Sequence, residues 1–361
     1  VPAGGKNAMA GRIIVAGHIC LDITPIFQSD RAQPLSQVLI PGKLVQMKDV
    51  NINTGGAVAN TGLALKLLGA DVELMGKVGD DEFGRIVLDR LRAYGVEEGS
   101  MIVSPDSGTS YSIVIAPPGT DRIFLHNPGA NNTFRARDLD FAKIARADFF
   151  HFGYPPIMRH MYEDGGAELA EIFRRVKGLG LTTSLDMAAV DPDSEAARAD
   201  WEEILKNVLP YVDYFVPSAE ELCFVADRER YQEWLARAGG GDVTAVLRWE
   251  EDIRPLARKV LAMGARNLLI KCGAPGLYYT DGTRELFERS YKPERVLSGT
   301  GAGDTSIAAF LKALMDGYSV EDCLHLAAAT GASCVEAYDA LSGLRPFEEL
   351  LRKIEAGWEK Q

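Results

Sequence analysis

Short apolar runs alternate with amphipathic stretches along most of the chain. The run at 12–17 is apolar and rich in β-branched residues, as a buried central strand is. Further strands are expected at 72–76, 149–152, 182–186, 214–216 and 267–271. Helices are expected at 56–68, 83–94, 165–179, 250–263, 305–315 and 320–337. This alternation predicts an α/β fold, a mostly parallel sheet flanked by helices, with ligands at the carboxyl ends of its strands.

Two regions depart from this alternation and predict a separate small sheet. Alternating segments follow one another at 38–44 and 44–52, and a second pair at 110–116 and 122–126 flanks a Pro-Pro-Gly-Thr-Asp turn. We therefore expect a small β-sheet lid over residues 37–53 and 109–127. The large α/β unit is expected over residues 11–36, 54–108 and 128–361. Within it, 191–209 predicts an inserted helix that is solvated on one face, and 228–248 predicts a surface excursion.

Composition and charge narrow the class of protein. The 361 residues include 39 basic and 51 acidic side chains, and this net charge of −12 disfavours nucleic-acid binding. The five cysteines form no CxxC pair, which is typical of a reduced cytoplasmic protein and not of a zinc site. The sequence also lacks a signal-peptide pattern and an apolar stretch of about 18 residues, so no membrane partner is expected. We expect a cytoplasmic protein that acts on a small molecule.

The segment Ser-Gly-Thr-Gly-Ala-Gly-Asp at 298–304 precedes an apolar helix. Its glycines let the N–H groups of Gly301, Ala302 and Gly303 converge on one point beside a helix N-terminus, which predicts an anion site. Asp304 at such a site is explained if a base must deprotonate a hydroxyl that attacks a bound phosphate. Alternatively, Asp304 is simply the N-cap of the helix. The spacing matches neither a Walker A motif nor a dinucleotide-binding fingerprint.

Two further segments accompany this turn. Residues 53–69 contain a Gly-Gly pair that opens a helix, with an Asn four residues later, and residues 76–84 follow the pattern G-x-V-G-x-D-x-x-G. Together the three segments resemble the signatures of the ribokinase-like (PfkB-type) carbohydrate kinases, and the resemblance extends from about residue 12 to 347. It implies a Rossmann-like ribokinase fold with a β-lid. It also implies transfer of the γ-phosphate of ATP to a sugar hydroxyl with Mg²⁺.

The resemblance also implies roles for individual residues. Asp304 corresponds to the catalytic base, and Gly301, Ala302 and Gly303 correspond to the anion hole. Asp22, expected at the end of the first strand, and Gly55, Gly56 and Asn60 correspond to sugar-binding positions, although a turn aspartate and a local helix-cap bond are the alternatives for Asp22 and Asn60. The implied nucleotide-binding positions are Ser218, Lys271, Gly273, Gly276, Thr300, Gly303 and Ala328.

Two carboxylates, Glu221 and Asp186, correspond to positions near magnesium, which they would reach through water. For Glu221 the alternative is a solvated carboxylate in the first turn of a helix. For the loop at 271–276 the alternative is a plain hairpin turn.

Four positions depart from the family pattern. Ser218 replaces an Asn, and Ser298-Gly299 replaces an Asp-Thr pair linked to a monovalent cation in ribokinase, which leaves a requirement for K⁺ open. Ala57 and Gly153 replace a Lys and a Glu of ribokinase, which argues against ribose. Tyr154 is expected to stack on or hydrogen-bond the substrate.

Other polar residues carry weaker expectations. Arg159 suits a substrate carboxylate or is an ordinary surface arginine. His18, His126, His151 and His160 are interpreted as ordinary core or surface histidines, with His126 near the lid.

We therefore expect an ATP-dependent small-molecule kinase for a sugar, sugar acid, nucleoside or cyclitol. A non-catalytic sensor of sugar or nucleotide on the same fold is the alternative. A nicotinamide-dependent oxidoreductase is disfavoured because the first strand-turn, Gly17 to Asp22, lacks the glycines that a pyrophosphate requires. The edge strands of the lid are compatible with a homodimer joined through it.

Overall fold

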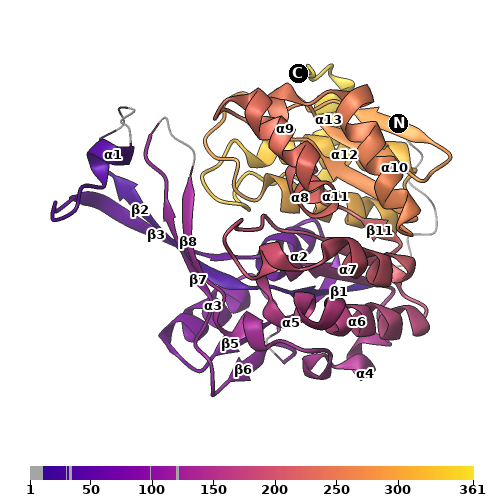
Figure 1. The fold of residues 1–361 in the computed structure, drawn as a ribbon, viewed down its shortest axis with the longest axis horizontal. Coiled ribbons are helices and arrows are strands. Elements are labelled where there is room, and N and C mark those ends of the chain that lie inside the picture. Colours follow the sequence, from indigo (N-terminus) through magenta and orange to yellow (C-terminus); the bar gives the residue numbers. More distant parts are fainter. Residues whose placement is uncertain (1–10, 30, 32–34, 98, 119–121) are drawn as a thin grey trace.

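The computed structural model describes residues 11–29, 31, 35–97, 99–118 and 122–361, and these residues form one large sheet, one smaller sheet and a two-stranded pair (Figure 1). The large sheet has the strand order β14-β13-β12-β11-β10-β9-β1-β4. Its strands are parallel from β4 through β12, and β13 and β14 are antiparallel additions at the edge. The bounds are β1 Arg12–Gly17, β4 Asp71–Met75, β9 Phe149–Gly153, β10 Thr182–Asp186, β11 Tyr214–Phe215, β12 Asn267–Lys271, β13 Leu277–Thr280 and β14 Glu285–Glu288. The predicted α/β architecture is confirmed.

Helices pack on both faces of this sheet because successive strand residues point to opposite sides. In β1, Ile14 and Ala16 enter a core shared with α6 Ala167–Gly178, whereas Ile13 and Val15 enter a core shared with α2 Ala57–Leu67. The first core also takes side chains from α7 Trp201–Val208, α8 Ala219–Ala226 and α10 Arg254–Ala262. The second core also takes side chains from α3 Glu82–Ala93, α11 Ala302–Met315, α12 Val320–Cys334 and α13 Phe347–Glu355. Short helices are α1 Leu35–Val38, α4 Phe141–Ile144 and α5 Arg159–Tyr162. Within the described ranges, no helix combines the length and apolarity needed to cross a membrane.

The smaller sheet has the order β3-β2-β7-β8 and extends away from the large sheet (Figure 1). Its strands are β2 Cys20–Phe27, β3 Met47–Gly55, β7 Tyr111–Ile115 and β8 Ile123–Asn127. The predicted β7–β8 hairpin forms, although residues 119–121 of its turn lie outside the described residues. A further pair, β5 Lys77–Gly79 and β6 Ile102–Ser104, forms a small sheet of its own.

Two expectations about the small sheet are wrong. The segment 38–44 forms no strand, and β2 belongs to this sheet although it was expected in the large unit. A lid that begins at residue 37 therefore omits one of its strands. The alternation of β2 is obscured by Pro25, beside which the register with β3 shifts, because proline cannot donate to the ladder.

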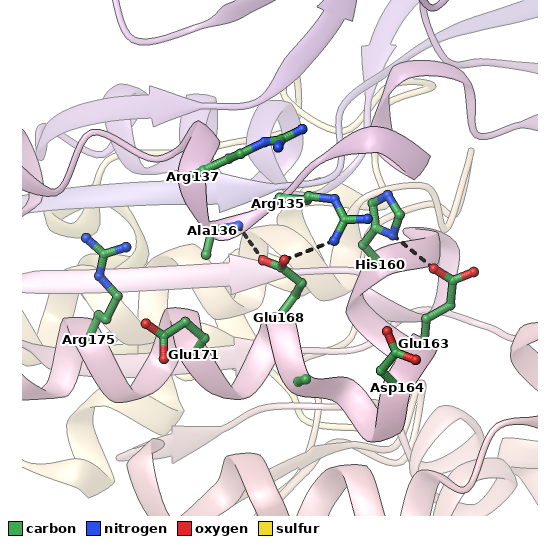
Figure 2. Close-up of a pocket in the computed structure, with 10 residues that line it drawn as sticks. Arg135, Ala136, Arg137, His160, Glu163, Asp164, Glu168, Glu171 and Arg175 are labelled. Carbon is green, nitrogen blue, oxygen red and sulfur yellow. Dashed lines mark hydrogen bonds and ion pairs between the residues drawn. The ribbon is translucent and has the colours of Figure 1, made fainter.

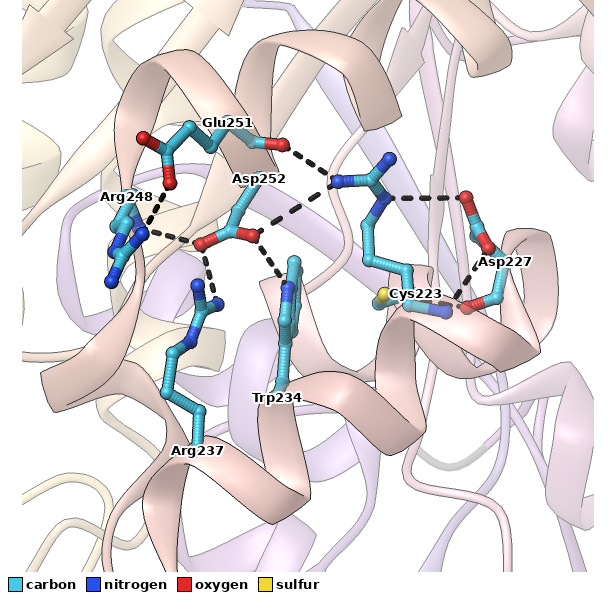
Figure 3. A network of polar contacts seen from close by, with 8 residues as sticks. Cys223, Asp227, Trp234, Arg237, Arg248, Glu251 and Asp252 are labelled. Atoms are coloured by element: carbon cyan, nitrogen blue, oxygen red, sulfur yellow. Dashed lines mark hydrogen bonds and ion pairs between the residues drawn. The ribbon is translucent and has the colours of Figure 1, made fainter.

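The expectation that residues 228–248 form a surface excursion also needs correction. It contains the helix α9 Arg228–Ala238, and Trp234 in this helix is completely buried. The expected helix at 250–263 begins later, as α10, after a π-helical turn at Trp249–Ile253. Figure 3 shows how Asp252 in this turn joins the two elements. Its carboxylate accepts hydrogen bonds from Trp234 Nε1 (2.9 Å), Arg237 Nη2 (2.6 Å) and Arg248 N (2.8 Å).

We predict that Asp252→Ala destabilises the protein by about 3–5 kcal/mol, because it leaves the Arg237 guanidinium and the indole N–H of Trp234 without their acceptor. Urea unfolding followed by circular dichroism measures the change. Glu251→Ala is the matched control: its carboxylate pairs with Arg248 at the surface, and an exposed pair contributes about 0–1 kcal/mol. Equal effects of the two substitutions would contradict the role assigned to Asp252.

Candidate active site

The glycine-rich turn leads directly into α11. Gly301 is the N-cap and has φ 76, a left-handed conformation in which a Cβ atom would also lie 2.2 Å from Cβ of Ala340. The helix begins at Ala302 and not at 305 as expected, so Asp304 lies in its first turn. The interpretation of Asp304 as N-cap is therefore wrong. The N–H groups of this first turn have no intrahelical acceptors and form the kind of site that binds anions.

Asp304 is 5% exposed and is held by donors from two other elements. Asn60 Nδ2 of α2 donates to Oδ2 at 3.0 Å, and Thr61 Oγ1 donates to Oδ1 at 3.3 Å. The hydroxyl of Tyr154, just after β9, lies 2.8 Å from both oxygens. The sequence alone did not indicate this contact between Tyr154 and Asp304.

Burial raises the pKa of the Asp304 carboxyl from its usual value, while the charge of Lys271 and the hydrogen bonds of Asn60 and Tyr154 oppose this rise. Burial and the Asp304 charge raise the pKa of Tyr154 well above its usual value, so the phenol keeps its proton and acts as the donor. A carboxylate in these surroundings has the chemistry of a general base.

Two departures from the family pattern, at positions 57 and 153, touch one another. A Cβ atom on Gly153 would lie 2.1 Å from Cβ of Ala57. Strand β9 therefore packs directly against the start of α2, and neither position has room for a longer side chain directed at the other. The next residue, Tyr154, has φ 70 and ψ 40, which is uncommon for a residue other than glycine. This conformation places its hydroxyl on Asp304.

Lys271 brings a positive charge to the glycine-rich turn. Its Nζ donates to Asp186 Oδ1 at 2.7 Å, and its stem lies 3.4 Å from where a Cβ of Gly303 would be. Burial lowers the pKa of Lys271, but the charges of Asp186 and Glu221 outweigh burial and raise it, so the ammonium persists. Burial raises the pKa of Asp186 to about 8, and Lys271 acts against this.

Asp186 and Glu221 offer oxygen ligands to a divalent cation. The second oxygen of Asp186, Oδ2, is buried without a hydrogen-bond partner. Glu221 Oε2 accepts from Ser218 N at 2.8 Å and Ser218 Oγ accepts from Glu221 N at 3.3 Å, so the departure at Ser218 completes a capping box. The described residues contain no cluster of three or more His, Cys, Asp or Glu side chains that could hold a metal. Two carboxylates nevertheless fit Mg²⁺, which is bound in kinases by one or two carboxylates together with substrate phosphates.

The loop at 271–276 is the turn that joins β12 to β13 in an antiparallel hairpin, as the alternative interpretation of this loop predicted. Gly273 has φ 65 and Gly276 has φ 126, and a Cβ on Gly276 would lie 2.1 Å from the carbonyl oxygen of Glu288. Thr244 approaches Gly273 from the segment that was expected to be a surface excursion. No signal in the sequence associated Thr244 with this loop.

At the other end of the site lies Asp22, on β2 opposite Asn53. It was expected at the end of the first strand. Burial raises the pKa of its carboxyl. Gly55 and Gly56 let the backbone approach closely: a Cβ on Gly55 would lie 2.3 Å from Asp22 Oδ2, and one on Gly56 would lie 2.6 Å from His18 Nδ1.

One cavity of about 1140 Å³ connects these groups. All of the predicted site residues line it except Gly55, namely Asp22, Gly56, Asn60, Tyr154, Asp186, Ser218, Glu221, Lys271, Gly273, Gly276, Thr300, Gly301, Ala302, Gly303, Asp304 and Ala328. The structure thus brings segments from the whole chain to the carboxyl ends of the parallel strands.

Among the lining residues that were not predicted as site residues are His18, Arg122 and His126. Arg122 precedes β8 and donates a hydrogen bond from Nη1 to the hydroxyl of Thr300, so the small sheet contacts the glycine-rich turn. Arg159, in contrast, pairs with Glu163 and Glu195 and does not line the cavity.

A second pocket, of about 600 Å³, lies beside α6 (Figure 2). Its charges are largely paired within the protein. Glu168 accepts hydrogen bonds from Arg135 Nη1 at 3.0 Å and from Ala136 N at 2.8 Å, and His160 contacts Glu163 at 2.9 Å. This pocket contains neither the glycine-rich turn nor the buried carboxylates of the large cavity.

Comparison with known proteins agrees with the geometry. The model of the pfkB family carbohydrate kinases matches residues 12–345. The chain is 27% identical over 332 residues to 2-dehydro-3-deoxygluconokinase of Thermoproteus tenax, covering 89% of this chain and 93% of that protein. It is 27% identical over 315 residues to Fructokinase-1 of Oryza sativa subsp. japonica, covering 84% and 88%.

The fold is similar to that of Arabidopsis thaliana ribokinase complexed with ribose and ATP. The TM-score is 0.73 at 20% identity, and the match covers 95% of this chain and 98% of the other. The matches in sequence and in fold extend over nearly the whole chain. The chain therefore belongs to the pfkB family of carbohydrate kinases.

Proposed function

We propose that this protein transfers the γ-phosphoryl group of ATP to a hydroxyl group of a sugar or sugar-like substrate, with Asp304 as general base. The observation that carries the proposal is the position of Asp304, a buried carboxylate in the first turn of α11, beside the N–H groups of the glycine-rich turn. The named relatives, which phosphorylate sugars or sugar acids, support the substrate class.

The hydrogen bonds of Asp304 leave room for one more donor. The two carboxylate oxygens have about four acceptor sites. Asn60 and Thr61 occupy two of them, and the single proton of the Tyr154 hydroxyl occupies a third, although this hydroxyl lies within reach of both oxygens. The remaining site can accept the proton of a substrate hydroxyl as that oxygen attacks phosphorus.

The transferred phosphoryl group would lie against the N–H groups of Gly301, Ala302 and Gly303, with the Lys271 ammonium near by. Mg²⁺ held by Asp186 and Glu221 would neutralise charge on the phosphates of ATP. Asp22, Gly55, Gly56 and Asn60 would bind the sugar-like substrate. The Tyr154 hydroxyl would keep its hydrogen bond to Asp304 beside that substrate. The nucleotide would extend along Ser218, Lys271, Gly273, Gly276, Thr300 and Ala328.

The small sheet serves as a lid in this proposal. The side chain of Arg122, just before β8, donates a hydrogen bond to Thr300. Asp22 of β2 and His126 of β8 line the same cavity. A lid in this position excludes water, which would otherwise compete with the substrate hydroxyl for the phosphoryl group.

The small sheet also supports a proposed homodimer. On the face opposite the cavity, Ile52, Ile23, Ile113 and Leu125 lie in register across the four strands. Leu125 is 54% exposed, and it lies on β8, an edge strand. A second copy of this chain would cover such an apolar edge. The free, buried cysteines support a reducing, cytoplasmic location.

Asp304→Asn is expected to lower kcat by roughly 10²- to 10⁴-fold, because the amide cannot accept the hydroxyl proton. ATP affinity, measured by titration calorimetry, is expected to change little. Asp316→Asn, at the C-terminal end of the same helix, is the control, since Asp316 pairs with Lys312 away from the cavity. Normal turnover of the Asp304 variant would exclude Asp304 as the general base. A wild-type protein that binds ATP and sugar without releasing ADP would favour the alternative function, a non-catalytic sensor.

Tyr154→Phe is expected to move the acidic limb of the kcat/KM profile to higher pH. The phenol stabilises the Asp304 carboxylate and so lowers its pKa; without this donor the pKa rises, and the base is protonated at a higher pH than before. Tyr231→Phe, on α9 and packed against Phe224, controls for the loss of a hydroxyl elsewhere. An acidic limb that stays in place or moves to lower pH would contradict this assignment.

The wild-type protein is expected to sediment with twice the 39.3 kDa mass of the chain, and Leu125→Glu is expected to sediment as a monomer. Burying a carboxylate in the centre of an apolar contact costs more free energy than the contact contributes to association. Val103→Glu, at an exposed position on β6, is the matched control and is expected to remain dimeric. A monomeric wild type would end the dimer proposal.

A further inference from the structure

A short segment after α13 reaches the large cavity. Residues 358–361 lie antiparallel to residues 290–292, with a β-bridge between Lys360 and Tyr291. Two backbone hydrogen bonds of 2.8 Å, one on each side of the bridge, join the two stretches. Gln361 of this segment lines the cavity. None of the roles assigned above involves the 358–361 segment.

Side chains hold the 358–361 segment in place. The ring of Trp358 lies against that of Tyr291, with centroids 4.8 Å apart, and its Nε1 donates to the carbonyl oxygen of Lys292 at 2.7 Å. Lys360 Nζ lies 2.5 Å from Oε1 of Glu288, a buried carboxylate in β14. Removal of one partner of a buried ion pair is strongly unfavourable, so this pair favours the docked position of the segment.

The stretch that this segment covers packs in turn against the loop at 271–276. A Cβ atom on Gly276 would lie 2.1 Å from the carbonyl oxygen of Glu288. Ser290 donates from Oγ to the carbonyl oxygen of Gly273 at 3.3 Å. Both glycines are among the proposed nucleotide-binding positions. The 358–361 segment therefore supports, from behind, the loop along which the nucleotide would extend.

The lining residues of the cavity form a wall between the glycine-rich turn and Gln361. In chain order from the segment's partner stretch to the turn, they are Ser290, Tyr291, Pro293, Val296, Gly299 and Thr300. The proposed nucleotide position Gly273 contacts this wall at Ser290. A nucleotide with its phosphates at the turn would extend along the wall and direct its base towards Gln361.

The side chain of Gln361 is exposed, so a ligand in the cavity can reach it. Its Nε2 lies 3.4 Å from the carbonyl oxygen of Tyr291 and donates to it. A carbonyl oxygen only accepts, so this contact fixes which end of the amide faces Tyr291. Oε1 is then directed away as an acceptor, and Nε2 keeps a second N–H as a donor.

An amide in this orientation discriminates between purine bases. Adenine offers a donor, its 6-amino group, beside an acceptor, the ring nitrogen N7, and a Gln amide pairs with both. Guanine has the carbonyl oxygen O6 in place of the amino group, so it would face Oε1 with a second acceptor. Guanine would fit a rotated amide, but rotation would place Oε1 against the carbonyl oxygen of Tyr291.

We propose that the 358–361 segment completes the nucleotide end of the cavity and that Gln361 selects adenine over guanine nucleotides. The inference rests on the proposed function and deepens it, since it names the residue that recognises the base of the phosphoryl donor.

The test measures the dissociation constants of Mg·ATP and Mg·GTP by titration calorimetry, which needs no phosphoryl transfer. The wild type is expected to bind ATP at least about 10-fold more tightly than GTP. Gln361→Ala is expected to reduce this preference to about 3-fold or less. Gln361→Lys, whose ammonium can only donate, is expected to bind GTP at least as tightly as ATP. Both variants are expected to keep the wild-type Tm, because Gln361 is exposed.

Glu359→Gln is the matched control within the same segment. Glu359 pairs with Lys292 at 3.2 Å and does not line the cavity, so the variant is expected to keep the wild-type preference. Trp358→Ala, which removes the aromatic anchor of the segment, is expected to weaken ATP binding about 10-fold. Equal affinities of the wild type for the two nucleotides, or a wild-type preference in both Gln361 variants, would overturn the inference.

Turnover separates this failure from failure of the proposed function. Release of ADP from ATP and of GDP from GTP is compared with a panel of sugars, at equal nucleotide concentrations below KM. Equally fast release from both nucleotides would overturn the inference and leave the kinase intact. A preference for ATP binding that Gln361→Ala abolishes, in a protein that releases no ADP with any sugar, would support the inference and contradict the kinase.

Discussion

A buried carboxylate imposes the main constraint on this structure. A charge removed from water costs several kcal/mol unless donors replace its hydration, and Asp304 receives donors from Asn60, Thr61 and Tyr154. These donors belong to α2 and to the end of β9, so α2, α11 and the sheet have to meet at one point. The same burial raises the pKa of the carboxyl. One packing arrangement thus holds three elements together and makes the side chain more basic, as the role proposed for it in phosphoryl transfer requires.

The contact between Gly153 and Ala57 allows these elements to meet. With no side chain on Gly153, β9 lies directly against α2, and Tyr154 then turns its ring towards α11 through a left-handed backbone conformation. Such a conformation costs about 1–3 kcal/mol and is maintained by the hydrogen bonds of the phenol. Positions 57 and 153 are therefore in direct packing contact, and the phenol that reaches Asp304 comes from Tyr154.

Charge divides the cavity into two ends. The N-terminus of α11, Lys271 and Arg122 lie near the glycine-rich turn, where phosphate charge develops. Asp22 brings a carboxylate to the other end, beside His18 and His126. Asp304 lies between the two, which is where a hydroxyl and a phosphoryl group have to meet.

Local patterns in the sequence were sufficient for much of the fold. The strands of the large sheet are buried on both faces, so each is a continuous apolar run that stands out from its neighbours. The glycine-rich motifs carry their own backbone geometry, and this is why the residues of the turn at 298–304 and of the loop at 271–276 could be identified. β2 was missed because Pro25 and Asp22 interrupt its alternation, and α9 was missed because a single buried tryptophan gives almost no periodic signal.

The site as a chemical unit was decided only by tertiary structure. Tyr154 and Asp304 are 150 positions apart, and Asn60 and Asp304 are 244 positions apart. His18 follows β1 and His126 belongs to β8, yet their ring centroids lie 5.1 Å apart. The sequence by itself determined the fold class through its periodicity, the glycine-rich turn through its local backbone geometry, and the family through the resemblance of its motifs. The partners of each buried polar group depend on how distant elements pack, and no local pattern records that.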